Sequence, residues 1–200
     1  MRLAYVASAQ ANELKVWRTP ESLPWSTWLK REFLEARATA RDATPLRRVL
    51  TPAQSRALWE DVVANSRFAR DLLNPSSAAR LAARSWRRLH DYLIPIEALA
   101  NYDVAEARAL DAWCKSFAAR CDELGAIDEA ELMHWADRAQ FVPADRITCA
   151  GFDTMPPAMT RLIDRWRRAG RFVDSNATAR GARHIEIVGA EDAAHELEGA

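Results

Sequence analysis

Apolar side chains recur at steps of three and four residues through the middle of the chain. The clearest run extends from Leu110 to Leu124, where Trp113, Phe117 and Cys121 fall on one helical face. Gly125 follows this run directly, which is typical of a helix that ends in a left-handed residue. The pattern therefore predicts an amphipathic helix that ends at this glycine.

Further helix starts are marked by capping residues. Thr51 with Gln54 forms a capping-box pattern, and Asp128 with Glu131 forms a second one. Proline at the first helical position also favours helix starts, and the chain places it after four candidate starts: Thr51-Pro52, Asn74-Pro75, Ser22 with Pro24, and Pro156-Pro157. Asp103 with Glu106 resembles one more start. These signals predict an all-helical block, which we bound at residues 49–142, and a helix on either side of it.

Short strand-like segments occur only outside this block. They are residues 14–17, 147–149, 171–174 and 184–188, while the arginine-rich residues 37–48 are predicted to form a loop. Strand, helix and strand joined by short loops are typical of a parallel sheet. We therefore expect an α/β fold, mostly helical by residue count, in which residues 1–48 and 143–200 form one α/β unit and residues 49–142 are inserted.

Composition places the chain among ordinary globular proteins. Of 200 residues, 49% are hydrophobic and 28% are charged, and the formal net charge is zero, which argues against a generally basic nucleic-acid protein but not against a local basic stripe. Three cysteines without a C-x-x-C pattern favour a reduced chain. With no signal-peptide pattern and no long apolar run, we expect a cytoplasmic protein without membrane contact.

Catalytic motifs are missing from the sequence. The six glycines are scattered and none precedes a lysine, so no phosphate-binding P-loop can form. Cys114 and Cys121 could hold zinc only if His90 or His134 converged on them, and core packing is the commoner role of such cysteines. We therefore predict no catalytic residue, no cofactor and no metal.

Two candidate sites have competing interpretations. Asp153, after the apolar run that starts at Ile147, could hold a metal, or it could cap the following helix or its turn while Gly151 supplies unusual backbone angles. Trp166 among arginines could stack on a base, or it could pack in the core. We favour the turn and the core. Adjacent arginines, which could contact phosphates, occur at positions 47–48, 87–88 and 167–168.

Five segments in order carry a family resemblance. They are VWRTPESLPWSTWL (16–29), LTPAQSRALWEDVV (50–63), WRRLHDY (86–92), WCKSFAARCDELGAID (113–128) and AGFDTMPPA (150–158). Together they resemble the N-terminal region of bacterial DNA repair proteins related to AddB-type helicase–exonuclease subunits, which carry a C-terminal PD-(D/E)XK nuclease. The resemblance covers nearly the whole chain.

The resemblance implies a partial RecA-like lobe, without its first strand, cut from a longer protein. It implies a helicase-like, ATPase-inactive lobe that binds DNA or acts as a scaffold, and whose partners are single-stranded DNA, the other helicase-like and nuclease lobes, and a helicase–nuclease subunit. DNA would then contact Arg18 and Thr19 after one strand, and Phe152, Asp153 and Thr154 after another. The alternatives are a protein-interaction module that contacts no DNA, and a small enzyme with a metal at Asp153.

Overall fold

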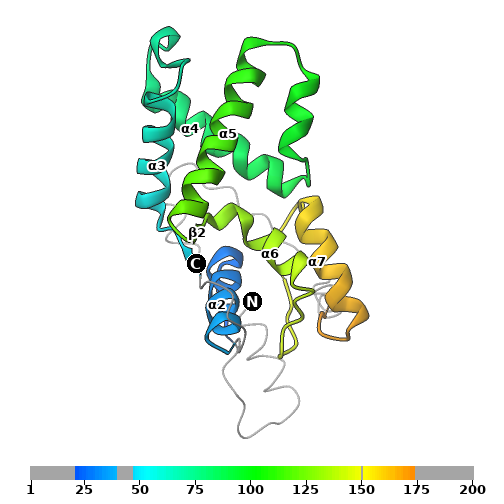
Figure 1. Ribbon diagram of the computed structural model, residues 1–200. Coiled ribbons are helices and arrows are strands. Elements are labelled where there is room, and N and C mark those ends of the chain that lie inside the picture. Colours follow the sequence, from blue (N-terminus) through cyan, green and yellow to red (C-terminus); the bar gives the residue numbers. More distant parts are fainter. Residues whose placement is uncertain (1–20, 40–46, 150, 174–200) are drawn as a thin grey trace, which may run out of the picture.

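The computed structural model describes residues 21–39, 47–149 and 151–173, and these residues are mostly helical (Figure 1). A single pair of short strands accompanies the helices. In chain order the elements are α2 (Trp25–Thr39), β1 (Arg48–Val49), α3 (Pro52–Ala64), η1 (Ala69–Asp71), α4 (Pro75–Asp91), η2 (Ile96–Asn101), α5 (Ala105–Glu123), β2 (Ala126–Ile127), η3 (Glu129–Glu131), α6 (Leu132–Arg138) and α7 (Pro157–Arg168).

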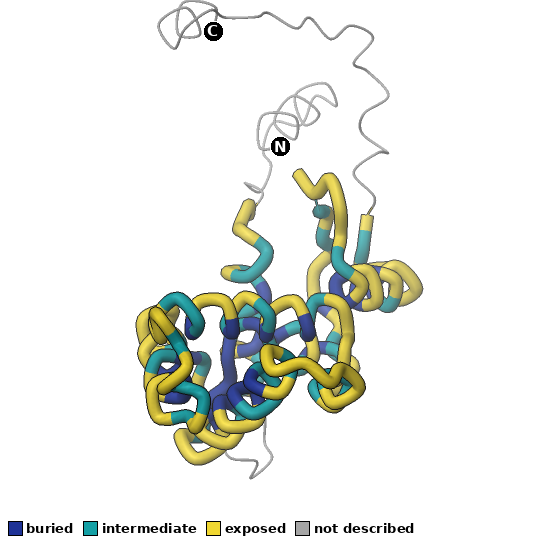
Figure 2. The backbone as a smooth tube through the Cα atoms, turned by 90° about the horizontal axis from the view of Figure 1, so that it is seen from above, coloured by how far each residue is buried: buried dark blue, intermediate teal, exposed yellow. Residues whose placement is uncertain are grey.

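Helices α3, α4 and α5 enclose the first of two hydrophobic cores. Trp59 of α3 stacks on Phe117 of α5, with ring centroids 4.0 Å apart, and Trp86 of α4 meets both rings edge to face. All three rings are fully buried, and Figure 2 shows buried residues along the inner sides of the helices and exposed residues outside. Large rings at the centre fix how the three helices pack.

The second core lies between α2, α6 and α7. Trp166 of α7 is fully buried and its indole N–H donates to the carbonyl of Phe141 at 2.7 Å. Trp25 and Trp28 of α2 pack against the same indole. Trp166 is thus a core residue, as the helical phase of the sequence predicts, and the arginines around it lie at the surface or pair with acids.

The two strands join the two cores. β1 and β2 pair in parallel, with Arg48 opposite Ala126 and Val49 opposite Ile127. Successive strand residues point to opposite faces, so Ala126 is buried in the first core and Ile127 in the second. Leu50, directly after β1, is buried in the first core. This strand pair is a seam through which both cores are connected.

Several of the predicted capping signals are confirmed. The capping boxes at Thr51 and Asp128 both form, Asn74 caps α4, and Gly125, just after the end of α5, has a positive φ of 56°. Two predicted caps are wrong. The carbonyl of Pro24 accepts the first backbone bond of α2, so that helix starts after Ser22, and α5 starts at Ala105 with no side-chain cap from Asp103.

The α/β expectation holds in its coarse form, as a mostly helical chain with a small parallel sheet. The predicted strand at Ile147 is reduced to one parallel bridge with Phe172, and the predicted strands at 14–17 and 184–188 lie outside the described residues. The predicted loop at residues 37–48 is wrong at both ends: α2 continues to Thr39, and β1 begins at Arg48. The second core crosses the expected boundary at residue 142, because α6 packs on α7.

Candidate nucleic-acid interface

A groove of about 400 Å³ between α3 and α4 is lined by four arginines. Arg80, Arg84 and Arg87 come from α4, and Arg56 comes from α3. On α4 the steps of four and three residues place three guanidinium groups along one helix face, over roughly 10 Å of helix axis. A row of this kind is the arrangement that follows a chain of negative charges.

The opposite face of α4 explains why the arginines point into the groove. Ala79, Ala82, Trp86 and Leu89 are buried against α3 and α5, so the polar positions between them must face outward. Ala79, at the edge of that buried face, and Ala83 also line the groove. The groove therefore follows from the amphipathic pattern of a single well-capped helix.

The positive charge of this groove is only partly neutralised. Arg87 lies 3.7 Å from a carboxylate oxygen of Glu129, and Arg80 donates to the hydroxyl of Ser77 at 2.7 Å. Arg56 and Arg84 make no hydrogen bond or ion pair with any residue that the structure describes. These two guanidinium groups can bind an anion without first breaking a contact.

Two of the three acids in the groove, Asp128 and Glu129, are engaged by neighbouring groups. Asp128 is 7% exposed, and its carboxylate accepts hydrogen bonds from the Ser55 hydroxyl at 2.6 Å and from the Ala130 backbone N–H at 3.0 Å. Glu129 faces Arg87, and Glu60 lies on α3. Asp128 is thus engaged inside the protein, and the exposed lining of the groove stays predominantly cationic.

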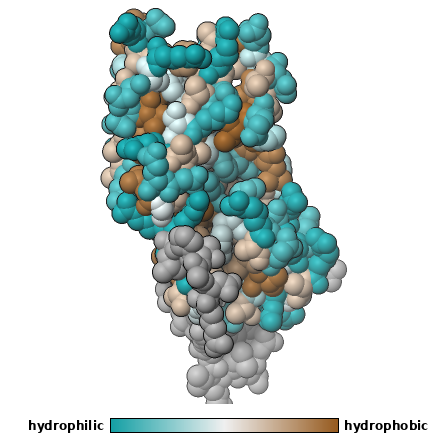
Figure 3. Space-filling model, viewed as in Figure 1, coloured by the Kyte–Doolittle hydropathy of each residue, from teal (hydrophilic) through white to brown (hydrophobic). Residues whose placement is uncertain are grey.

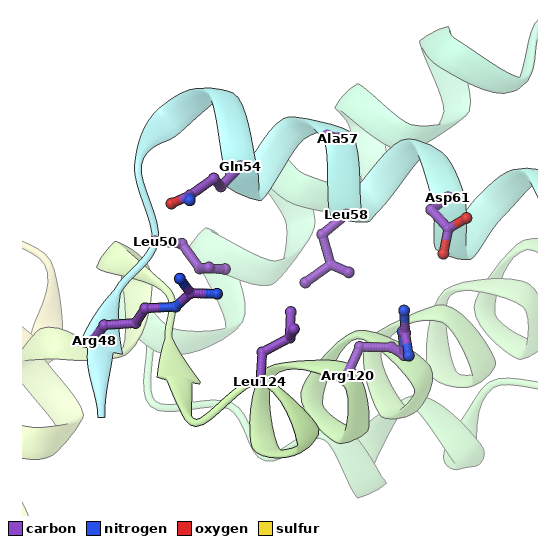
Figure 4. A pocket seen from close by; sticks show the side chains of 8 residues that line it. All are labelled: Arg48, Leu50, Gln54, Ala57, Leu58, Asp61, Arg120 and Leu124. Carbon is purple, nitrogen blue, oxygen red and sulfur yellow. The ribbon is translucent and has the colours of Figure 1, made fainter. Parts of the chain in front are cut away.

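A second groove, of about 330 Å³, lies on the other side of α3, against α5 (Figure 4). Leu50, Leu58 and Leu124 form its apolar floor, and Arg48 and Arg120 stand at its edges. Arg120 donates to Glu123 at 2.7 Å, whereas the side chain of Arg48 has no such contact within the described ranges. The two grooves share the α3 wall and Leu50.

The predicted DNA contacts at residues 152–154 lie elsewhere. Phe152, Asp153 and Thr154 are exposed in the segment before α7, and neither groove includes them. Gly151 adopts a φ of 77°, as the turn interpretation expects, but α7 begins after Pro156 with no side-chain cap, so the predicted capping role of Asp153 is wrong. Arg18 and Thr19 lie outside the described residues.

Cysteine and histidine side chains do not converge. Cys114 and Cys121 are buried, and burial raises the pKa of each thiol to about 12, so neither forms a thiolate readily. His90 and His134 lie near each other, with ring centroids 6.4 Å apart. Among the described residues no group of three or more potential ligands could hold a metal ion, and Asp153 therefore has no convergent acids there.

The adjacent arginine pairs singled out in the sequence contribute only part of the candidate interface. Arg48 and Arg87 line the two grooves, but Arg47 pairs with Asp122 at 2.6 Å and Arg88 lines neither groove. The stronger signal was the spacing of Arg80, Arg84 and Arg87, because residues three and four apart share a helix face whereas neighbours do not. Sequence reasoning missed this row by considering adjacent pairs.

No helix in the described part of the chain has the length and apolar character needed to cross a membrane. Comparisons with family models, with curated proteins and with solved structures find no match for this chain.

Proposed function

We propose that this protein is a helicase-like, ATPase-inactive lobe that holds single-stranded DNA within a DNA-repair helicase–exonuclease. The observation that supports DNA holding is the row of arginines in the groove between α3 and α4, where Arg56 and Arg84 have no partner among the residues that the structure describes. Guanidinium groups bind phosphate oxygens in a bidentate manner and keep their charge at any physiological pH. The repair context comes from the sequence resemblance alone.

The proposed role requires no chemistry by this chain. The sequence contains no P-loop, so it has no backbone cradle for the phosphates of ATP. The arginines would instead fix a strand by its phosphates, which positions DNA without reading its sequence. Other lobes of the protein would act on the strand that this lobe holds.

A titration of the full 200-residue chain with a fluorescently labelled single-stranded oligonucleotide tests this function. If the arginines make three to four phosphate contacts, raising the salt from about 50 to 200 mM should weaken binding roughly twenty- to fiftyfold. The double variant R80A/R84A should bind more weakly at low salt and show a shallower salt dependence. Arg108→Ala is the matched control, because Arg108 is exposed on α5, lines neither groove and carries the same charge.

Two results would overturn the DNA-holding function. One is the absence of binding at low salt. The other is an equal loss of affinity in R80A/R84A and in a double control that removes Arg70 and Arg108, since that would trace binding to overall charge and not to the groove. Arg84→Lys adds a finer test: it should keep the salt dependence and lose affinity, because lysine lacks the bidentate fork.

One observation favours the alternative of a protein-interaction module. Apolar Tyr92, Leu93 and Ile94 follow α4 and are exposed, and Leu93 has a positive φ of 56°. Figure 3 shows apolar surface gathered between η2 and α5, above α7. An exposed apolar surface is typical of a contact with another protein domain. If this protein did not bind DNA but bound another protein domain through this apolar surface, the alternative would be supported.

A further inference from the structure

The two grooves differ in what they offer to a nucleic acid. The aromatic residue that lines the α3–α4 groove is Trp59, which is only 1% exposed and cannot stack on a base. That groove therefore provides contacts for phosphates only. The α3–α5 groove has an apolar floor, and Leu124 on that floor is 42% exposed. A flat, weakly polar base can cover this leucine, whereas a phosphate cannot.

The surface between the grooves is low enough for a strand to cross. The helical phase of α3 places Ala53, Ala57 and Glu60 outward; Ala57 lines the α3–α5 groove, Glu60 lines the α3–α4 groove, and Ala53 lies outside both. Two of these three side chains are single methyl groups. A strand leaving the arginines of α4 can therefore cross α3 at Ala53 and Ala57 toward Leu124, away from the carboxylate of Glu60, which repels phosphates.

The polar groups of the α3–α5 groove give an orientation to a bound nucleotide. Arg48 stands at one end and points into the groove, while Asp61 and Arg120 stand at the other end (Figure 4). There Arg120 donates to Glu123, whereas the side chain of Arg48 has no such contact among the described residues. The carboxylate of Asp61 repels a phosphate, and Arg48 attracts one. The side-chain oxygen of Gln54 accepts the Thr51 N–H at 3.0 Å, and its amide N–H groups, which donate to no described residue, can meet a base edge.

We propose that the strand held by the α4 arginines crosses α3 and places one unpaired base on the leucine floor of the α3–α5 groove, with Arg48 on the adjoining phosphate. This inference rests on the proposed DNA-holding function. It assigns preference for single strands to the second groove, because a base that is paired and stacked in a duplex cannot lie on Leu124. The first groove, which contacts phosphates alone, accepts either form of DNA.

The test compares a labelled single-stranded oligonucleotide with a hairpin duplex of the same composition, using the full chain and four variants. Leu124→Asn should weaken single-strand binding roughly three- to tenfold and leave duplex binding unchanged, as expected for loss of one apolar contact. Arg84→Ala should weaken both. Arg48→Ala should weaken the single strand and lower its salt dependence. Leu73→Asn is the matched control, since Leu73 is fully exposed outside both grooves.

The outcomes separate this inference from the function on which it rests. If Leu124→Asn binds the single strand as tightly as the unaltered chain while Arg84→Ala binds it weakly, the base site is overturned and the DNA-holding function stands. If Leu124→Asn weakens duplex binding equally, the groove does not select single strands and the inference is again overturned. Absence of any DNA binding overturns both. Circular dichroism checks that each variant is folded.

Discussion

We predict that the carboxylate of Asp128 contributes more to the stability of the fold than any other buried polar group that the structure describes. It follows β2 directly, caps the turn η3 that leads into α6, and accepts the Ser55 hydroxyl of α3 at 2.6 Å. The side chain of Asp128 thus connects the strand pair, the second core and helix α3, which forms the wall shared by both grooves. Replacing Asp128 by alanine removes all of these contacts at once.

The cost of Asp128→Ala can be worked from its two kinds of contact. Loss of an N-cap lowers the free energy of unfolding by about 1 kcal/mol. Loss of a hydrogen bond to a charged acceptor costs about 1.5–3 kcal/mol. Release of a buried carboxylate from its desolvated site offsets part of this. We therefore expect a loss of about 2–3 kcal/mol in the free energy of unfolding.

Urea denaturation followed by circular dichroism measures this loss. Thr51→Ala is the matched control, because Thr51 caps α3 in an equivalent capping box but its side chain makes no bond to another helix. Thr51→Ala should cost only about 1 kcal/mol. The double variant Asp128→Ala/Ser55→Ala, compared with the two single variants, gives the coupling energy of this pair. That energy is the difference between the stability lost in the double variant and the sum of the two single losses. Equal losses in Asp128→Ala and Thr51→Ala would refute the claim that Asp128 joins the two cores.

Three further predictions concern the buried groups. Phe117→Ala removes the ring stacked on Trp59 and should lower the free energy of unfolding by about 3–5 kcal/mol, measured by urea titration; a loss below about 1 kcal/mol would contradict the packing. Burial raises the pKa of Glu131, so the folded state holds its proton more tightly, and stability falls as pH rises above about 4.5 toward the folded pKa. Glu131→Gln, which keeps the acceptor of the capping box, should flatten this part of the pH profile of stability. An unchanged profile would contradict the raised pKa. Cys114 and Cys121, with thiol pKa values of about 12, should react with a thiol reagent at pH 8 only as fast as the chain unfolds, and rapid labelling under native conditions would contradict their burial.

The helices were predictable because their signals are local. Thr51, Asn74 and Gly125 each act within four residues of their own position, through a hydrogen bond or a backbone angle that the residue itself favours. Trp166 was assigned correctly for a similar reason, because its helical phase with Leu162 requires burial. Information of this range is fully contained in a short window of sequence.

The strand seam was not predictable in the same way. β1 is two residues long and sits in an arginine-rich stretch, so neither hydrophobic alternation nor β-propensity identifies it. It forms because Leu50 and Val49 must be placed in two different cores, and its partner β2 lies far along the chain. Conversely, the apolar run at Ile147 makes only one bridge. Whether a short apolar segment becomes a strand depends on a partner that the segment does not encode.

The seam also explains why the candidate interface is built on α3. This helix is held at its start by the parallel bonds that place Leu50, in its middle by the Ser55–Asp128 bond, and on its inner face by Trp59 against Phe117. Three independent contacts leave α3 little freedom to shift, so the arginines on its two sides keep a fixed separation. In the proposed function, binding of a strand would then cost little reordering of the protein, and its affinity would depend on the guanidinium groups themselves. For this reason Asp128→Ala should weaken DNA binding at temperatures where the variant is still folded, although Asp128 carries the wrong charge to contact a phosphate. If its affinity were unchanged, the fixed position of α3 would not matter for binding.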